Sequence, residues 1–171
     1  GLTLAEMGFP TLLIDADFRN PSLARRFGLN GPVGLSTFLA GGPPVLHETS
    51  VPNLHILPAG PLPPNPVALF NSSRLSEALV ELKKRFHFVL VDGPPVLSLA
   101  DASVLASKVN GVILIVQAGR TPQEIVSKAI TQLNRSGACI VGAAVNQVDL
   151  KRPEYSAYQS YYYHERTRSD R

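Results

Sequence analysis

Three aspartates of the sequence follow apolar segments in a way that suits cation binding. Asp15 and Asp17 come directly after residues 12–14, in the string Leu-Leu-Ile-Asp-Ala-Asp-Phe-Arg, and Asp92 directly follows residues 88–91. Carboxylates gathered at strand ends suit a hard cation such as Mg²⁺, which keeps several waters and bridges phosphate groups. Phosphoryl transfer depends mainly on positioning and charge neutralisation, so Mg²⁺-holding carboxylates are expected there. The three aspartates are therefore candidate metal ligands for phosphate chemistry.

Each aspartate taken alone has a simpler interpretation, namely that it caps a helix or a turn. Two apolar segments that end in the same way, one of them with Asp-x-Asp, favour the metal site over this alternative. Asp92 is also poorly placed as a helix cap, because Pro94 and Pro95 follow it within three residues.

All five tyrosines fall within the last 17 residues of the chain, from position 155 to position 171. Tyrosine ordinarily occurs in cores, strands and interfaces, so this distribution needs an explanation. One interpretation is an adhesive, low-complexity tail. The favoured one is a cluster of phosphate acceptors, because each phosphate adds about −1.5 to −2 charges and would reverse the slight positive excess of the tail. The candidate acceptors are Tyr155, Tyr158, Tyr161, Tyr162 and Tyr163.

The elements that position these residues alternate along the chain. Apolar segments predict strands at residues 11–14, 54–57, 86–91, 112–116 and 140–145. Helical periodicity predicts helices at residues 35–40, 74–85, 99–108 and 122–136. This alternation indicates an α/β fold with a doubly wound, mostly parallel sheet flanked by helices. Ligands of such sheets bind beyond the carboxyl ends of the strands, where the three aspartates are expected.

Several local signals mark the element ends. Residues 2–7 followed by Gly8 predict the last turns of a helix, and Asn65 before Pro66 predicts a helix start. Capping boxes are predicted from Thr121 to Glu124 and from Ser98 to Asp101. Residues 57–66 are rich in proline and predict a stiff connection. Periodicity stops after residue 149, so we predict one domain over residues 1–149 and a disordered tail over residues 150–171.

Composition excludes several classes of function. A chain of 171 residues accommodates one ordinary domain, and its formal charge of +3 is too small to indicate nucleic-acid binding. The apolar segments are far too short to cross a bilayer. The single cysteine, Cys139, lies in an apolar run and is predicted to be a small buried hydrophobe.

Together these features resemble the bacterial tyrosine kinases (BY-kinases) of capsule and exopolysaccharide synthesis. Residues 12–19 resemble the Walker A′ motif of that family, and residues 88–95, Phe-Val-Leu-Val-Asp-Gly-Pro-Pro, resemble its Walker B motif. Residues 20–23, 57–60 and 64–66 also resemble family segments, and the terminal tyrosines resemble its tyrosine cluster. The resemblance covers nearly the whole chain. The Walker B string alone is weakly specific, whereas Walker A′ together with the tail is strongly specific.

The resemblance implies a P-loop NTPase-like fold and a protein tyrosine autokinase that uses ATP and Mg²⁺ to phosphorylate the tail of a neighbouring copy. Asp15 and Asp92 would hold Mg²⁺ and its waters, and Asp17 would bind the metal or accept the tyrosine proton. Arg19 belongs to the Walker A′ motif and is grouped with the cofactor-binding residues, without an individual role. Asn146 would contact adenine, with a plain turn residue as the equal alternative.

The same resemblance implies partners and a location. It implies a ring-like homo-oligomer and a membrane-spanning activator, either fused or separate, with no nucleic-acid partner. The protein would work in the cytoplasm at the inner face of the plasma membrane, where it would regulate polysaccharide chain length or export.

Two departures from the family pattern alter these expectations. Gly93 stands where the family commonly has a hydroxyl residue, and no Gly-x-x-x-x-Gly-Lys-[Ser/Thr] string occurs anywhere in the sequence. We therefore expect that an upstream strand and P-loop, together with the family's self-association segment, are missing, and that the chain alone is a poor kinase. Two other interpretations are a partitioning or septum-placement ATPase of the P-loop superfamily and a non-catalytic docking module.

Overall fold

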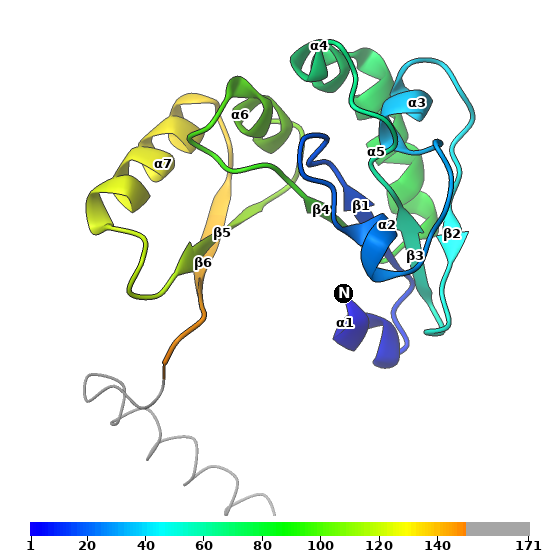
Figure 1. Cartoon of the computed structure of the whole chain (residues 1–171), viewed down its shortest axis with the longest axis horizontal. Coiled ribbons are helices and arrows are strands. Elements are labelled where there is room, and N and C mark those ends of the chain that lie inside the picture. Colours follow the sequence, from blue (N-terminus) through cyan, green and yellow to red (C-terminus); the bar gives the residue numbers. More distant parts are fainter. Residues whose placement is uncertain (150–171) are drawn as a thin grey trace, which may run out of the picture.

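The strands of the computed structural model, which describes residues 1–149, are divided between two sheets. The larger sheet has the order β2-β3-β1-β4, and the smaller one pairs β5 with β6. The strands are β1 (Thr11–Asp15), β2 (His47–Glu48), β3 (Leu54–Leu57), β4 (Phe88–Asp92), β5 (Val112–Gln117) and β6 (Ile140–Asn146). Figure 1 shows the β5–β6 pair set apart from the larger sheet. The predicted α/β class is confirmed, and the division into two sheets is a feature that the periodicity did not predict.

The central strand β1 fixes the register of the larger sheet. It runs parallel to β3 on one side and to β4 on the other, with Asp15 paired to Asp92 at the carboxyl end. The short strand β2 adds to β3 in the antiparallel direction. Two residues are too few for a period of two to be recognised, so β2 was not predicted.

Seven helices connect the strands within the described residues, and most occur where the periodicity predicted them. They are α1 (Leu2–Glu6), α2 (Leu23–Arg26), α3 (Leu35–Leu39), α4 (Pro66–Asn71), α5 (Ser73–Arg85), α6 (Ala100–Ala106) and α7 (Gln123–Arg135). The predicted start of α4 is confirmed, because the side chain of Asn65 accepts a hydrogen bond from the backbone N–H of Ala68 at 3.0 Å. None of these helices is long and apolar enough to cross a membrane.

The two predicted capping boxes are wrong. The N-cap of α7 is Pro122, because the hydroxyl of Thr121 is engaged by the backbone N–H of Gln117 at 3.3 Å. Glu124 forms a surface ion pair one turn further along α7. The N-cap of α6 is Leu99, with no side-chain hydrogen bond, and Asp101 in its first turn pairs with a distant arginine. A local backbone partner therefore replaces the predicted cap at α7, and a tertiary partner engages Asp101 at α6.

Each sheet has its own hydrophobic core, and α6 belongs to both. Leu105 packs into the larger core around β1 and α5, whereas its neighbour Ala106 packs into the smaller core between α7 and β5. The helix that follows β4 is thus the physical link between the two halves.

The β5–β6 sheet is covered on one face by α7 and is open elsewhere. Leu114 is buried beneath α7, whereas Ile113 and Ile115, which alternate with it, are 61% and 62% exposed. Val141 on β6 is 64% exposed. Cys139 is exposed as well, so the prediction of a buried thiol is wrong: its neighbours Ala138 and Ile140 pack against the smaller core, whereas Cys139 does not. A two-stranded sheet with exposed isoleucines is an incomplete core.

The proline-rich connection after β3 packs closely against the start of α3. The backbone N–H groups of Leu35 and Ser36 donate to the carbonyls of Pro58 and Ala59 at 2.7 and 2.9 Å. A Cβ atom added at Gly34 would overlap the carbonyl oxygen of Pro58 and the backbone nitrogen of Gly60. Only a residue without a side chain allows this approach of two backbones.

Replacing Gly34 with alanine is therefore expected to destabilise the chain by about 2 kcal/mol, as overpacking against a fixed backbone does. The measurement is the free energy of unfolding in urea. Gly142→Ala is the matched control, because a Cβ atom at Gly142 meets nothing within 4 Å and the residue has an ordinary φ angle. Equal unfolding midpoints for the two variants would contradict the prediction.

Candidate nucleotide and metal site

Asp15 organises the loop that follows β1. The residue is 1% exposed, and its Oδ2 accepts hydrogen bonds from the backbone N–H groups of Ser22 and Leu23 at 2.8 and 2.9 Å. Its Oδ1 accepts the backbone N–H of Asp17 at 3.2 Å. The carboxylate therefore folds residues 16–22 back on themselves and satisfies the first N–H groups around α2. This is the capping role that the sequence left open, and one lone pair of Oδ1 stays available.

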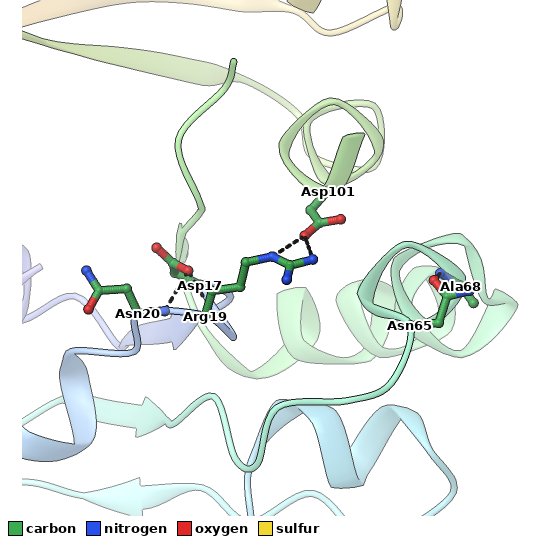
Figure 2. A network of polar contacts seen from close by, with 6 residues as sticks. All are labelled: Asp17, Arg19, Asn20, Asn65, Ala68 and Asp101. Carbon is green, nitrogen blue, oxygen red and sulfur yellow. Dashed lines mark hydrogen bonds and ion pairs between the residues drawn. The ribbon is translucent and has the colours of Figure 1, made fainter. Parts of the chain in front are cut away.

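Asp17 lies in the same loop and faces the solvent side of the site. Its Oδ1 accepts the backbone N–H groups of Arg19 and Asn20 at 3.2 and 3.0 Å, as Figure 2 shows. Among residues 1–149, no protein donor is bonded to its second oxygen. Asp17 can therefore receive a ligand without losing the bonds that hold its carboxylate.

An aromatic stack holds this loop against the larger core. Phe18 is 4% exposed and its ring stacks on that of Phe70 with the centroids 5.0 Å apart. Because Ala16 and Phe18 are buried, the side chains between and after them, Asp17 and Arg19, are directed outward. Side chains after β1 therefore continue to alternate between the core and the outside, as they do in a strand.

Asp92 ends β4 directly beside Asp15. The two residues are Cα partners in the parallel register of β1 and β4. Burial first, and then the negative charges of Asp15 and Asp17, raise the pKa of Asp92 above its ordinary value, and Arg26 opposes this rise. The aspartates predicted from the sequence therefore do converge at one edge of the sheet, where their charges repel one another.

This arrangement fits Mg²⁺ held together with phosphates and water. Within residues 1–149, no three carboxylate, imidazole or thiol groups lie close enough together to hold a cation by themselves. Mg²⁺ is usually bound by one or two carboxylates and completes its shell with water and substrate phosphates. The repulsion at Asp92, which Arg26 offsets only in part, and the open oxygen of Asp17 are the features that a cation and its waters would satisfy.

A large cleft lies beside these carboxylates, between the two sheets. Its volume is about 890 Å³, and it extends from Asp17 and Asp92 along β4 to β5 and α7. Residues 93–97, which follow β4, line its mouth. The cleft is bordered by the edges of β4 and β5 on which neither strand has a partner among residues 1–149.

The other predicted site residues lie elsewhere. Asn146 is the last residue of β6, where its Oδ1 accepts the backbone N–H of Gln147 at 2.8 Å. It belongs to the smaller sheet and is absent from the lining of the cleft. The guanidinium of Arg19 is engaged with Asp101 on α6. The five tyrosines lie outside the described residues.

Asp101 is the site residue that sequence reasoning missed. It lies 82 positions from Arg19, and its position in the first turn of a helix suggested a local cap. A distant arginine leaves no local pattern in the sequence. The burial of a carboxylate next to the helix start is the observation that reveals it.

The parallel α/β fold, with paired carboxylates at the carboxyl ends of adjacent strands, defines a nucleotide-binding protein of the P-loop class. The cell-division ATPase MinD of Pyrococcus furiosus has this fold and matches 91% of the chain, which spans 68% of MinD, with a TM-score of 0.70 and 24% identity. This likeness supports the fold alone. No protein-family model matches the chain.

The relatives of the chain give the family. The tyrosine-protein kinase CpsD of Streptococcus agalactiae is 37% identical over 164 residues, which are 94% of this chain and 72% of that kinase. The kinase domain of the Escherichia coli tyrosine kinase ETK matches 89% of this chain, and the match covers 60% of the ETK chain, with a TM-score of 0.84 and 30% identity. The chain belongs to the bacterial tyrosine-protein kinase family, which consists of transferases. The predicted family is confirmed, and the septum-placement alternative is not favoured.

Proposed function

We propose that the chain forms most of an ATP-dependent tyrosine autokinase that phosphorylates the terminal tyrosines of a neighbouring copy. The observation that carries this proposal is the register pairing of Asp15 with Asp92, with Asp17 open to the same cleft. In the proposed reaction, the tyrosine oxygen bonds to the γ-phosphorus of ATP, the bond from that phosphorus to the bridging β-phosphate oxygen breaks, and ADP leaves. The phenolic proton passes to a carboxylate.

The roles of the aspartates follow from their environments. Asp92 and Asp15 would hold Mg²⁺, which when bound neutralises the charge that develops on the phosphates. Asp15 is fixed by three backbone N–H groups and offers one lone pair, so it is suited to hold a metal-bound water. Asp17 has an open oxygen and would bind the metal or accept the tyrosine proton. Asn146 would contact adenine.

We also propose that residues 1–149 form a P-loop domain that is completed by one more strand. The edges of β4 and β5 face a common cleft, and neighbouring strands of a sheet lie about 4.8 Å apart. A strand in that cleft would join the two sheets, and the P-loop after it would bring backbone N–H groups and a lysine to the phosphates. The Gly-x-x-x-x-Gly-Lys-[Ser/Thr] string that such a loop requires does not occur in the sequence.

The partners and the location are proposed from the family resemblance. They are a homo-oligomer, which brings one copy's tail to the next copy's site, and a membrane-spanning activator. The proposed location is the cytoplasmic face of the plasma membrane, with regulation of capsule or exopolysaccharide export as the role. The tail, residues 150–171, is proposed as the substrate.

A mixing experiment tests the proposed function. An extended version of the chain, which carries an amino-terminal strand and P-loop, is mixed with the tagged 171-residue chain and ATP, and phosphotyrosine on each is measured by mass spectrometry. We expect the extended chain to phosphorylate both tails, and Asp17→Asn in the extended chain to abolish both signals. ATP hydrolysis without phosphotyrosine would select a P-loop ATPase. Neither ATP hydrolysis nor phosphotyrosine in the mixture would select the docking module.

A further inference from the structure

An ion pair ties the loop that carries Asp17 to the helix that links the two halves of the molecule. Both Nε and Nη2 of Arg19 donate to Oδ2 of Asp101 at 3.3 Å, as Figure 2 shows. The Asp101 side chain is 6% exposed, whereas that of Arg19 is 47% exposed. Among residues 1–149, no other donor is bonded to Asp101. A buried carboxylate with a single cationic partner depends strongly on that partner.

The backbone of Arg19 connects this ion pair to the candidate site. Its N–H donates to Oδ1 of Asp17 at 3.2 Å, and the N–H of Asn20 donates to the same oxygen at 3.0 Å. The position of the Arg19 backbone therefore determines where the carboxylate of Asp17 points. Asp101, through the guanidinium, determines where Arg19 lies.

The helix at the other end of the ion pair has a particular place in the fold. It begins after residues 93–97, which follow Asp92 and line the mouth of the cleft. Its residues Leu105 and Ala106 enter the cores of the larger and the smaller sheet respectively. The ion pair is thus a direct polar contact from the Asp17 loop to the element that continues from Asp92.

We propose that Arg19 and Asp101 are a positioning pair that sets the carboxylate of Asp17 relative to Asp92, and that Arg19 is not a nucleotide ligand. The proposal rests on the proposed function in assigning Asp17 to phosphate transfer. A guanidinium that gives two donors to a buried carboxylate has little reason to leave it for a solvated phosphate.

The first measurement is made on the 171-residue chain and does not depend on activity. In Asp101→Asn, amide hydrogen exchange of Arg19 and Asn20 is expected to accelerate roughly tenfold, because the loop loses a charge-assisted bond. Glu81→Gln is the matched control, because Glu81 forms an exposed ion pair with Lys84 on α5. Arg19→Lys, at an exposed side chain, is expected to fold and to give an intermediate rate. Exchange of Arg19 and Asn20 at the unaltered rate in Asp101→Asn would overturn the proposal.

The second measurement uses the extended chain with its P-loop. Positioning predicts that Asp101→Asn lowers kcat roughly tenfold and leaves KM for ATP unchanged, because only the orientation of Asp17 is lost. If Arg19 were instead a nucleotide ligand restrained by Asp101, the same variant would lower KM, and that result would overturn the proposal. If the unaltered extended chain forms no phosphotyrosine, the proposed function fails, whereas the exchange measurement still decides the role of the pair.

Discussion

Replacing Asp92 with asparagine is expected to abolish tyrosine phosphorylation and at the same time to stabilise the metal-free chain. The loss should reach roughly a thousandfold in the extended chain, because a correctly held metal contributes several kcal/mol to phosphate chemistry and each 1.36 kcal/mol is tenfold in rate. The gain in stability has a separate cause. Burial and the charges of Asp15 and Asp17 raise the pKa of Asp92, so its ionised form opposes folding.

The sign of the pH dependence follows from proton binding. Because the pKa of Asp92 is higher in the folded chain than in the unfolded one, the folded state binds more protons between the two values. Stability due to this group is therefore lost as the pH rises through that window. The Tm of Asp92→Asn should exceed that of the unaltered chain at neutral pH, and the difference should vanish below the ordinary aspartate pKa of about 4.

Thermal unfolding with and without Mg²⁺ and ATP separates the two effects. In the extended chain, the Tm of Asp92→Asn should not rise on addition of the ligands, whereas the Tm of the unaltered extended chain should rise by several degrees. Glu48→Gln is a suitable control, because Glu48 is exposed on β2 at the far edge of the same sheet. A lower Tm for Asp92→Asn at neutral pH would contradict the electrostatic account, and unchanged phosphorylation would contradict the metal role.

Supplying the strand and P-loop that we propose for the cleft is expected to convert a poor nucleotide binder into a good one. The 171-residue chain has carboxylates for a cation but no glycine-rich loop for phosphates, so its affinity for ATP should be weak. The extended chain should bind MgATP at least about a hundredfold more tightly, which corresponds to about 2.7 kcal/mol. Isothermal titration calorimetry on both chains is the measurement.

A second extended chain separates filling of the cleft from phosphate binding. It keeps the added strand but has alanine in place of the P-loop lysine. We expect this variant to reach the higher Tm of the extended chain, because β4 and β5 gain backbone partners, and yet to bind ATP weakly. Efficient self-phosphorylation of the 171-residue chain after addition of ATP would show instead that the missing loop is not needed.

The sequence was sufficient for most of the elements and for the meeting of the carboxylates. Asp15 and Asp92 follow apolar runs, and parallel strands place their carboxyl ends at one edge, so the pairing of the two residues could be foreseen. The start of α4 was equally predictable, because Asn65 and Pro66 act within one turn of the chain. The local rule for Asn65 succeeds because no other group among residues 1–149 engages its side chain, whereas the local rules for the two capping boxes fail.

Features that depend on distant partners could not be foreseen. Helix α2 has four residues, and its first N–H groups are held by Asp15, which precedes it by a loop rather than by one position. The bond from Arg19 to Asp101 joins positions 82 residues apart. The separation of β5–β6 from the larger sheet arises because no strand of residues 1–149 occupies the space between β4 and β5. None of these three features produces a periodic pattern of apolar residues in the sequence.

The presence of two separate cores has a consequence for cooperativity. The smaller core, around Leu114 and Leu133, shares only α6 with the larger one. Two units joined through a single short helix need not melt as one, so the Tm values compared above for Asp92→Asn are those of the larger unit, which contains Asp92. A nucleotide that contacted both units would unite their melting. Binding at the site would then be detectable as joint unfolding of the two units, including parts of the molecule far from the phosphates.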